Sequence, residues 1–210
     1  MKTLSLIHLT FFFAISASSS VTHAITVFTD FNGDKVHDSN ITISPGITTV
    51  GVFAALSKDE ITEHGGLAGF TVRFDGDGAN IEGATDSERQ SNINIDSIWD
   101  FVPTKTFAAT DRVRVDGSTL TGDTASEPYA SPLVHLFDVN LRFLPRSTPY
   151  SVQLSLAGGA AVSFIADDFF EFDSDAILQG TEVNVVPVPT AFWLFLSSLF
   201  FLKRNEIQKK

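Results

Sequence analysis

The chain of 210 residues contains no cysteine. Disulfides, thiol catalysis and cysteine-based zinc sites are therefore excluded together. Basic residues are also few, with 14 Lys and Arg against 25 Asp and Glu. The chain shows no basic patch, and an acidic surface repels nucleic acid and anionic lipid, so we expect no nucleic-acid partner. Such a surface suits cations or neutral sugars.

Recognisable catalytic motifs are missing as well. His37, His64 and His135 lie in separate segments, without the His-Glu-x-x-His spacing of zinc peptidases. Neither a Gly-x-Ser-x-Gly elbow nor a glycine-rich phosphate loop occurs. Carboxylates are so numerous that a glycosidase pair stays open, yet nothing singles one out. We assign no catalytic residue and expect a non-enzymatic protein, with a polysaccharide-acting enzyme as an alternative.

Residues 1–24 have the pattern of a secretory signal peptide. A basic start at Lys2 precedes an apolar run from Leu4 to Ile15, and Thr22-His23-Ala24 offers small residues at the −3 and −1 positions. The apolar run is too short to span a bilayer well, which argues against an uncleaved anchor. We expect cleavage between Ala24 and Ile25, and hence an exported protein.

The C-terminal end carries a second pattern, over residues 186–204. An extended segment, Val186-Pro187-Val188-Pro189, is fixed by its prolines. An uncharged run from Ala191 to Leu202 follows and includes Trp193, and Lys203-Arg204 forms a basic stop. We expect a short transmembrane helix with its positive end in the cytoplasm. Its twelve residues would span about 18 Å of a hydrocarbon layer of roughly 30 Å, which suits a segment that is processed.

This order of elements resembles a PEP-CTERM sorting signal. The matching residues are Val186, Pro187, Pro189, Ala191, Trp193, Leu194, Phe195, Leu199 and Arg204. The resemblance implies a Gram-negative exported protein that is held briefly in the inner membrane by this helix. An exosortase-type enzyme would then cleave it near the Pro-x-Pro motif, which sends it to the cell surface or the medium. Such proteins are associated with exopolysaccharide, a further partner, and with biofilm. A buried core helix and an ordinary tail anchor are the alternatives, and residues 205–210 would form a basic cytoplasmic tail.

Residues 25–185 are left as one exported domain, with nine Lys and Arg against 24 Asp and Glu, a net charge of −15. Polar and apolar side chains alternate over residues 67–74, 132–143 and 150–156, as in half-buried antiparallel strands. Weaker strand patterns cover residues 25–29, 40–44, 48–56, 92–98, 112–115, 161–165 and 179–185. With turn residues between them, the segments predict an all-β fold, an antiparallel β-sandwich of about nine or ten strands. One short helix is expected over Ser57–His64.

A second resemblance concerns this domain. Gly66–Asp75 contains the pairs Gly69-Phe70 and Phe74-Asp75, and two later strands follow at residues 136–143 and 150–156. The pattern is similar to cohesin-like and carbohydrate-binding sandwich modules, and it implies a carbohydrate- or protein-binding role. Trp99 and Tyr129 lie in loop-like stretches where they could stack on a sugar ring. His135 is placed by the alternation on the apolar face of its strand, as a satisfied core residue.

Three acidic segments are candidates for calcium. Asp30, Asn32, Asp34 and Asp38 occupy positions 1, 3, 5 and 9 of a calcium-loop pattern. Lys35 stands where the loop needs glycine and Ile41 where a bidentate acid belongs, so an Asx-rich turn is the alternative. Asp75–Gly78 is predicted to be a hairpin turn. The acidic stretch of residues 167–175 is predicted to be an edge strand, with calcium ligation as the alternative. No other cofactor is expected.

Overall fold

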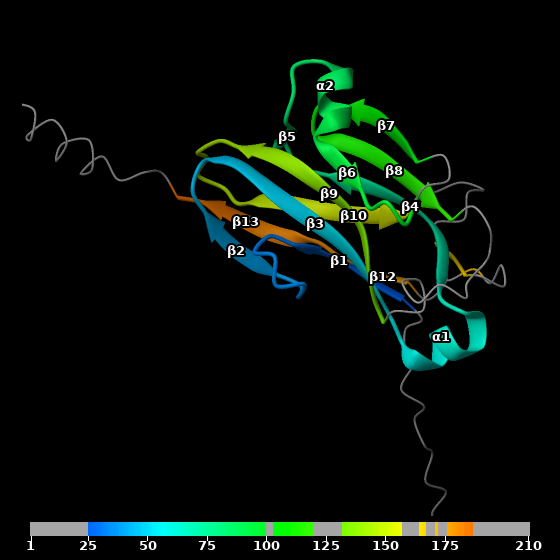
Figure 1. Ribbon diagram of the computed structural model, residues 1–210. Helices are drawn as coiled ribbons and strands as arrows, with labels where there is room; N and C mark the ends of the chain where they lie inside the picture. Colours follow the sequence, from blue (N-terminus) through cyan, green and yellow to red (C-terminus); the bar gives the residue numbers. More distant parts are fainter. Residues whose placement is uncertain are drawn as a thin grey trace, which may run out of the picture.

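The computed structural model describes residues 25–99, 103–119, 132–156, 164–166, 171 and 176–186. Two β-sheets pack into a sandwich (Figure 1). The predicted all-β sandwich is therefore confirmed for this part of the chain. No helix in it is long and apolar enough to cross a membrane. The expected signal peptide and the segment from Pro187 onward lie outside the described residues, so they stay predictions.

The first sheet has six strands in the order β12-β1-β3-β9-β5, with β6 also paired to β9. Their bounds are β12 (Ala176–Gln179), β1 (Ile25–Asp30), β3 (Gly46–Leu56), β9 (Leu133–Phe143), β5 (Asn80–Ile81) and β6 (Ile93–Ile95). The long strands β3 and β9 form its centre and pair antiparallel.

The second sheet has seven strands in the order β2-β13-β10-β4-β8-β7, with β11 also paired to β4. Their bounds are β2 (Asn40–Ile43), β13 (Thr181–Val185), β10 (Tyr150–Leu156), β4 (Leu67–Asp75), β8 (Arg112–Ser118), β7 (Thr104–Ala109) and β11 (Phe164–Ala166). Strand β4 lies in the middle of this sheet, and β8 and β7 continue it to one edge.

The expected antiparallel pairing is wrong at two places. Strand β12 pairs parallel with β1, and β2 pairs parallel with β13. Both pairs join the first strands of the domain to its last, and no hairpin constrains strands so far apart in sequence. Alternation of side chains indicates a strand but not the direction of its neighbour, so this pairing was not predictable.

Two short helices lie outside the sheets. Helix α1 (Lys58–His64) is the expected one, capped by Ser57 and ended by Gly65 at φ 80°. Helix α2 (Asp86–Ser91) was not predicted. Its start is a capping box, in which the Thr85 side chain accepts the Glu88 N–H and the Glu88 side chain accepts the Thr85 N–H.

The interface between the sheets is filled by aromatic rings. Phe70 and Phe74 on β4 pack against Phe137 on β9, with ring centroids 6.1 and 6.5 Å apart. Trp99 meets Phe70 edge-on at 5.1 Å. Gly117 on β8 leaves room for these rings, because a Cβ there would lie 2.5 Å from a ring carbon of Phe70. Large rings and one small residue thus fix the spacing of the sheets.

The turn at Asp75–Gly78 does not close a hairpin. It leads from β4 in the second sheet to β5 in the first. Asp77 and Gly78 have φ of 53° and 86°, so positive φ is used as predicted. The Asp77 carboxylate accepts a 2.6 Å hydrogen bond from Arg146, and this bond is the first cause that holds the pKa of Asp77 below its usual value. The turn therefore ties the two sheets together.

Candidate functional site

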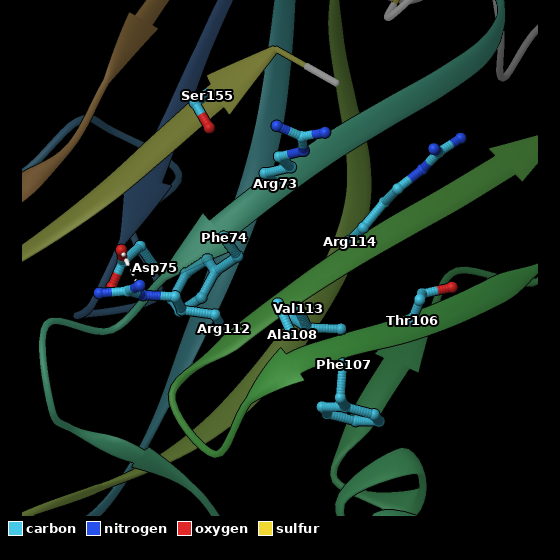
Figure 2. Close-up of a pocket in the computed structure, with 10 residues that line it drawn as sticks. All are labelled: Arg73, Phe74, Asp75, Thr106, Phe107, Ala108, Arg112, Val113, Arg114 and Ser155. Carbon is cyan, nitrogen blue, oxygen red and sulfur yellow. Dashed lines mark ion pairs between the residues drawn. The ribbon is translucent and has the colours of Figure 1, made fainter. Parts of the chain in front are cut away.

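The outer face of the second sheet carries a row of four polar side chains in register. Ser155 on β10 is opposite Arg73 on β4, Arg73 is opposite Arg114 on β8, and Arg114 is opposite Thr106 on β7. We call these four residues the arginine row. Their side chains stand on one face because each is at a paired position of the pleat. Figure 2 shows this row with its neighbours.

A groove of about 390 Å³ follows the arginine row. Its sides are the polar side chains of β4, β8 and β7, and its floor includes Phe74 and Val113, which are buried in the core. Arg112, on β8 like Arg114, closes one end by an ion pair with Asp75 at 2.9 Å (Figure 2). The groove is therefore built on packed strands, so its side chains are held by a rigid sheet.

Asp116, two residues after Arg114 on β8, fixes the orientation of that arginine. Its carboxylate accepts hydrogen bonds from Thr71 at 2.7 Å, from Thr104 at 2.6 Å and from Arg114 at 2.8 Å. Burial alone would raise the pKa of Asp116, but these three donors outweigh it and hold the pKa below its usual value. Asp116 is therefore ionised and orients Arg114 through its Nε atom.

Arg73 is the uncompensated charge of the row. Its side chain is exposed and makes no hydrogen bond or ion pair within the described part of the chain. Its direct cross-strand neighbour is Arg114, so two like charges face each other, an arrangement that destabilises a sheet. In a domain with a net charge of −15, this pair is a local surplus of positive charge.

The sequence contains no basic run, but the fold brings basic residues together at this groove. Three of the nine basic residues of the domain meet at this groove, from β4 and β8. The only sequence signal was Arg112-Val113-Arg114-Val115, which places two arginines on the polar face of one strand. That β4 lies beside β8 could not be deduced from it.

The predicted calcium residues do lie in one loop. Asp30 is 3% exposed and accepts the backbone N–H groups of Asn32, Gly33 and Lys35 at 2.8–3.0 Å. Lys35 adopts φ 64°, so a lysine makes the turn for which glycine is usual. Asp38 closes the loop through an amide hydrogen bond from Asn32 at 3.3 Å.

Asp34 belongs to the same loop and accepts the Val36 N–H at 2.9 Å. The loop has the hydrogen bonds of an Asx-rich turn, with its carboxylates directed at backbone donors, and calcium binding by it stays a prediction. Among the described residues, no group of three or more acidic or histidine side chains is placed to hold a metal ion.

His135 is not on the core face of β9. Val52 is opposite Phe137 and Phe53 is opposite His135, so Leu136 is an extra residue and forms a β-bulge. The bulge reverses the alternation, and His135 turns outward, where its ring lies 4.9 Å from that of Phe53.

Two carboxylates hold the outward ring of His135. Its Nδ1 lies 3.1 Å from Asp96, and its Nε2 lies 2.9 Å from Asp138. Burial alone would lower the pKa of His135, but the two acids outweigh it and raise the pKa above its usual value. The cluster is a bridge between β9 and the segment that follows β6.

Trp99 is not available to a sugar ring. It is 1% exposed, and its indole N–H donates to the His135 carbonyl at 2.9 Å. The sequence around Trp99 suggested a loop, but the residue lies in the core. Tyr129 and nearly all of residues 167–175 lie outside the described part; within it, only Glu171 is seen, in an antiparallel bridge with Ile165.

Comparisons with known proteins show the same architecture. No protein-family model matches the chain, and no curated protein is detectably similar to it in sequence. The seventh ScaB type I cohesin of Pseudobacteroides cellulosolvens is similar in structure, with a TM-score of 0.52 and 9% identity over 78% of this chain and 93% of that chain. The cohesin CaCohA2 of Clostridium acetobutylicum has a TM-score of 0.49 at 9% identity, over 78% of this chain and 92% of its own. At such identity the likeness concerns the fold alone: this chain folds as a β-sandwich like that of the cohesin modules.

Proposed function

We propose that the chain is an exported, non-enzymatic module that binds an acidic partner protein in the groove of the arginine row. One observation carries the proposal, the cross-strand pair of Arg73 and Arg114, in which Arg73 has no partner among the described residues. Two facing arginines lower the stability of the isolated sheet, and a bound carboxylate removes that repulsion. The pair is therefore better suited to a complex than to the free domain.

The chemistry of the row selects carboxylates. A guanidinium group is planar, stays charged and binds a carboxylate through two parallel hydrogen bonds. Ser155 and Thr106 add a hydroxyl at each end of the row. The other surfaces of this acidic domain repel an acidic partner, so the groove also determines the orientation of docking.

A protein partner fits better than a neutral sugar. Trp99, one of the two residues that suggested stacking on a sugar, is buried in the core, and the other, Tyr129, lies outside the described residues. Cohesin OlpA of Clostridium thermocellum was solved in a complex with a dockerin, which is a protein partner. For the present chain the proposal rests on the arginine row and not on that likeness.

Export and sorting belong to the same proposal. The N-terminal signal brings the domain across the inner membrane, and the PEP-CTERM-like tail holds it there until an exosortase-type enzyme releases it. The backbone ladder reaches Val186, whose N–H donates to Ile43 at 3.0 Å, directly before Pro187. Folded sheet and sorting motif are thus adjacent in the sequence, with no linker between them.

The binding proposal is tested by capture from the envelope fraction of the host. Full-length wild type is compared with Arg73→Glu and with Lys58→Glu, which makes the same charge change on exposed α1. We expect an acidic protein, identified by mass spectrometry, that wild type and Lys58→Glu retain and Arg73→Glu loses. Retention should fall as salt rises from low to physiological strength. If Arg73→Glu retains the same proteins as wild type, the groove is not the binding site.

The export proposal is tested by intact-mass analysis of the native protein in membrane and extracellular fractions. A species that begins at Ile25 and ends near Val188 is expected outside the cell. A membrane species that retains Trp193 and the residues after it, with no shorter form, would contradict the sorting signal.

A further inference from the structure

We infer that the acidic partner presents an extended segment, which adds to the second sheet as a new strand along the free edge of β7. The inference rests on the proposed function and specifies it, because it names the edge that binds, the backbone conformation of the ligand and its charge. In strand addition, ladder hydrogen bonds supply affinity and side-chain contacts supply specificity.

The outer edge of β7 is open within the described residues. The strand pairs with β8 on one side, and no described residue pairs with it on the other. Its register shifts between Phe107 and Ala109, so the bulge lies at the turn end and residues 104–107 remain regular. An edge of this kind offers unpaired N–H and C=O groups to another strand.

Side chains from the α2 side hold this edge in place. Arg89 on α2 lies over the ring of Phe107, with its guanidinium carbon 5.5 Å from the ring centroid. The ammonium group of Lys105 donates to the carbonyl of Gln90 at 2.7 Å and also to that of Ile93. Lysine on an edge strand usually repels a further strand. Here the lysine is turned inward and bound, so the edge is rigid and unprotected.

The outer face of β7 lets Arg114 reach past it. Thr104, Thr106 and Ala108 are small and exposed, and residues 104–109 include no acid. An added strand would lie about 4.8 Å beyond β7 and roughly 10 Å beyond β8. Arg114 on β8 and a glutamate on the added strand can span that gap together, since only Thr106 stands between them in the row. The Nε atom of Arg114 binds Asp116, and its terminal nitrogens make no hydrogen bond or ion pair within the described residues.

The positive charge of the arginine row favours one kind of ligand at the edge of β7. A second copy of the domain, paired edge to edge, would bring two arginine rows together and repel. A neutral strand would leave the repulsion between Arg73 and Arg114 in place. An acidic strand gives the terminal nitrogens of Arg114 a carboxylate and so lowers that repulsion, and it gains a backbone ladder that a polysaccharide cannot form.

The test uses three synthetic peptides of the same alternating glutamate and valine sequence. One is unmodified, one is N-methylated at the glutamates, and one is N-methylated at the valines. In a strand, the N–H groups that point to one edge come from alternate residues. We expect the unmodified peptide to bind full-length protein, and only one of the two methylated peptides to bind about tenfold more weakly or worse.

Variants place the binding on the sheet. Arg114→Gln should weaken the unmodified peptide about tenfold. Arg73→Gln should weaken it less, because β8 and β7 lie between Arg73 and the added strand, and Lys58→Gln should leave the affinity unchanged. Amide exchange followed by NMR adds a second readout, because alternate amides among residues 104–107 should become protected only when the peptide is bound. Thermal melting shows whether each variant is folded.

Equal affinity for the three peptides, or no new protection in β7, would overturn strand addition and leave the groove as a site for side-chain contacts. If neither arginine variant changes the affinity for the peptide, the groove is not the binding site either. If the unmodified peptide does not bind at millimolar concentration, the inference fails. The capture experiment then decides the proposed function separately, because it requires no particular conformation of the partner.

Discussion

A pair of buried threonines between the two sheets allows a sharp test of the fold. Thr29 on β1 and Thr181 on β13 are 0% and 2% exposed, and their hydroxyl oxygens lie 2.6 Å apart. Thr181 also bonds the backbone carbonyl of Asp38. A carbonyl can only accept, so the single hydroxyl proton of Thr181 goes to Asp38, and Thr29 must donate to Thr181.

Because the direction of the hydrogen bond is fixed, replacing Thr29 and replacing Thr181 should cost different amounts of unfolding free energy. Thr29→Val keeps the shape and removes one hydrogen bond while the Thr181 proton stays bound, so we expect a loss of about 1 kcal/mol of unfolding free energy. Thr181→Val removes the acceptor of Thr29 and the donor to Asp38, so a buried hydroxyl and a half-buried carbonyl lose partners and about 2–4 kcal/mol is expected. The double variant should lose no more unfolding free energy than Thr181→Val alone, because it also removes the Thr29 hydroxyl that Thr181→Val leaves without an acceptor.

Urea unfolding of the purified protein measures these costs as shifts of the midpoint at unchanged m-value. Thr42→Val, at an exposed threonine of β2, is the control and should stay within about 0.5 kcal/mol of wild type. Equal losses for Thr29→Val and Thr181→Val would refute the assigned direction. A double variant equal to the sum of the singles would refute the hydrogen bond itself.

Further outcomes follow from other contacts. The pKa of His135 is raised in the folded state, so its contribution to stability is complete below its unfolded pKa of about 6.5 and is lost as pH rises through the folded value. The urea midpoint of wild type should therefore fall toward that of His135→Gln over this pH range. A midpoint that does not fall in this way would contradict the bridge. Gly117→Ala forces its Cβ against Phe70 and should cost about 1–3 kcal/mol, so an unchanged midpoint would mean that the rings can move. Phe137→Ala empties a fully buried position and should cost about 3–5 kcal/mol by the same assay. Millimolar calcium should raise the melting temperature modestly at most, and no shift would remove the calcium hypothesis for the loop of residues 30–38.

Strands with clean alternation were predictable from the chain alone. The segments 67–74 and 150–156 correspond to β4 and β10 with nearly the same bounds, because one face of each is apolar without interruption. Strand β7 was missed since Thr104–Ala109 has only one large apolar residue, Phe107, and its pairing with β8 provides the rest. Helix α2 had a readable signal, the Thr85-x-x-Glu88 capping box, that was overlooked.

The site was less predictable than the strands that carry it. Alternation placed Arg73 on the polar face of its strand, but its contact with Arg114 depends on the pairing of β4 with β8, which are separated by β5, β6, β7 and α2 in the chain. For His135, alternation predicted the core face of β9, but a one-residue bulge at Leu136 turns the side chain outward. Register and bulges are set by tertiary packing, and no local pattern encodes them.

The parallel pairs of β1 with β12 and β2 with β13 also bear on when the domain can fold. Both sheets are completed by residues 176–186, which pair with residues 25–43. A contact between the two ends of a domain is slow to form because the loop that it closes is long. The chain is made from its N-terminus, so β1 and β2 wait without these partners until the last strands arrive. The two sheets therefore cannot be completed until residues 176–186 have been made and the segment that precedes Pro187 has joined the sheet.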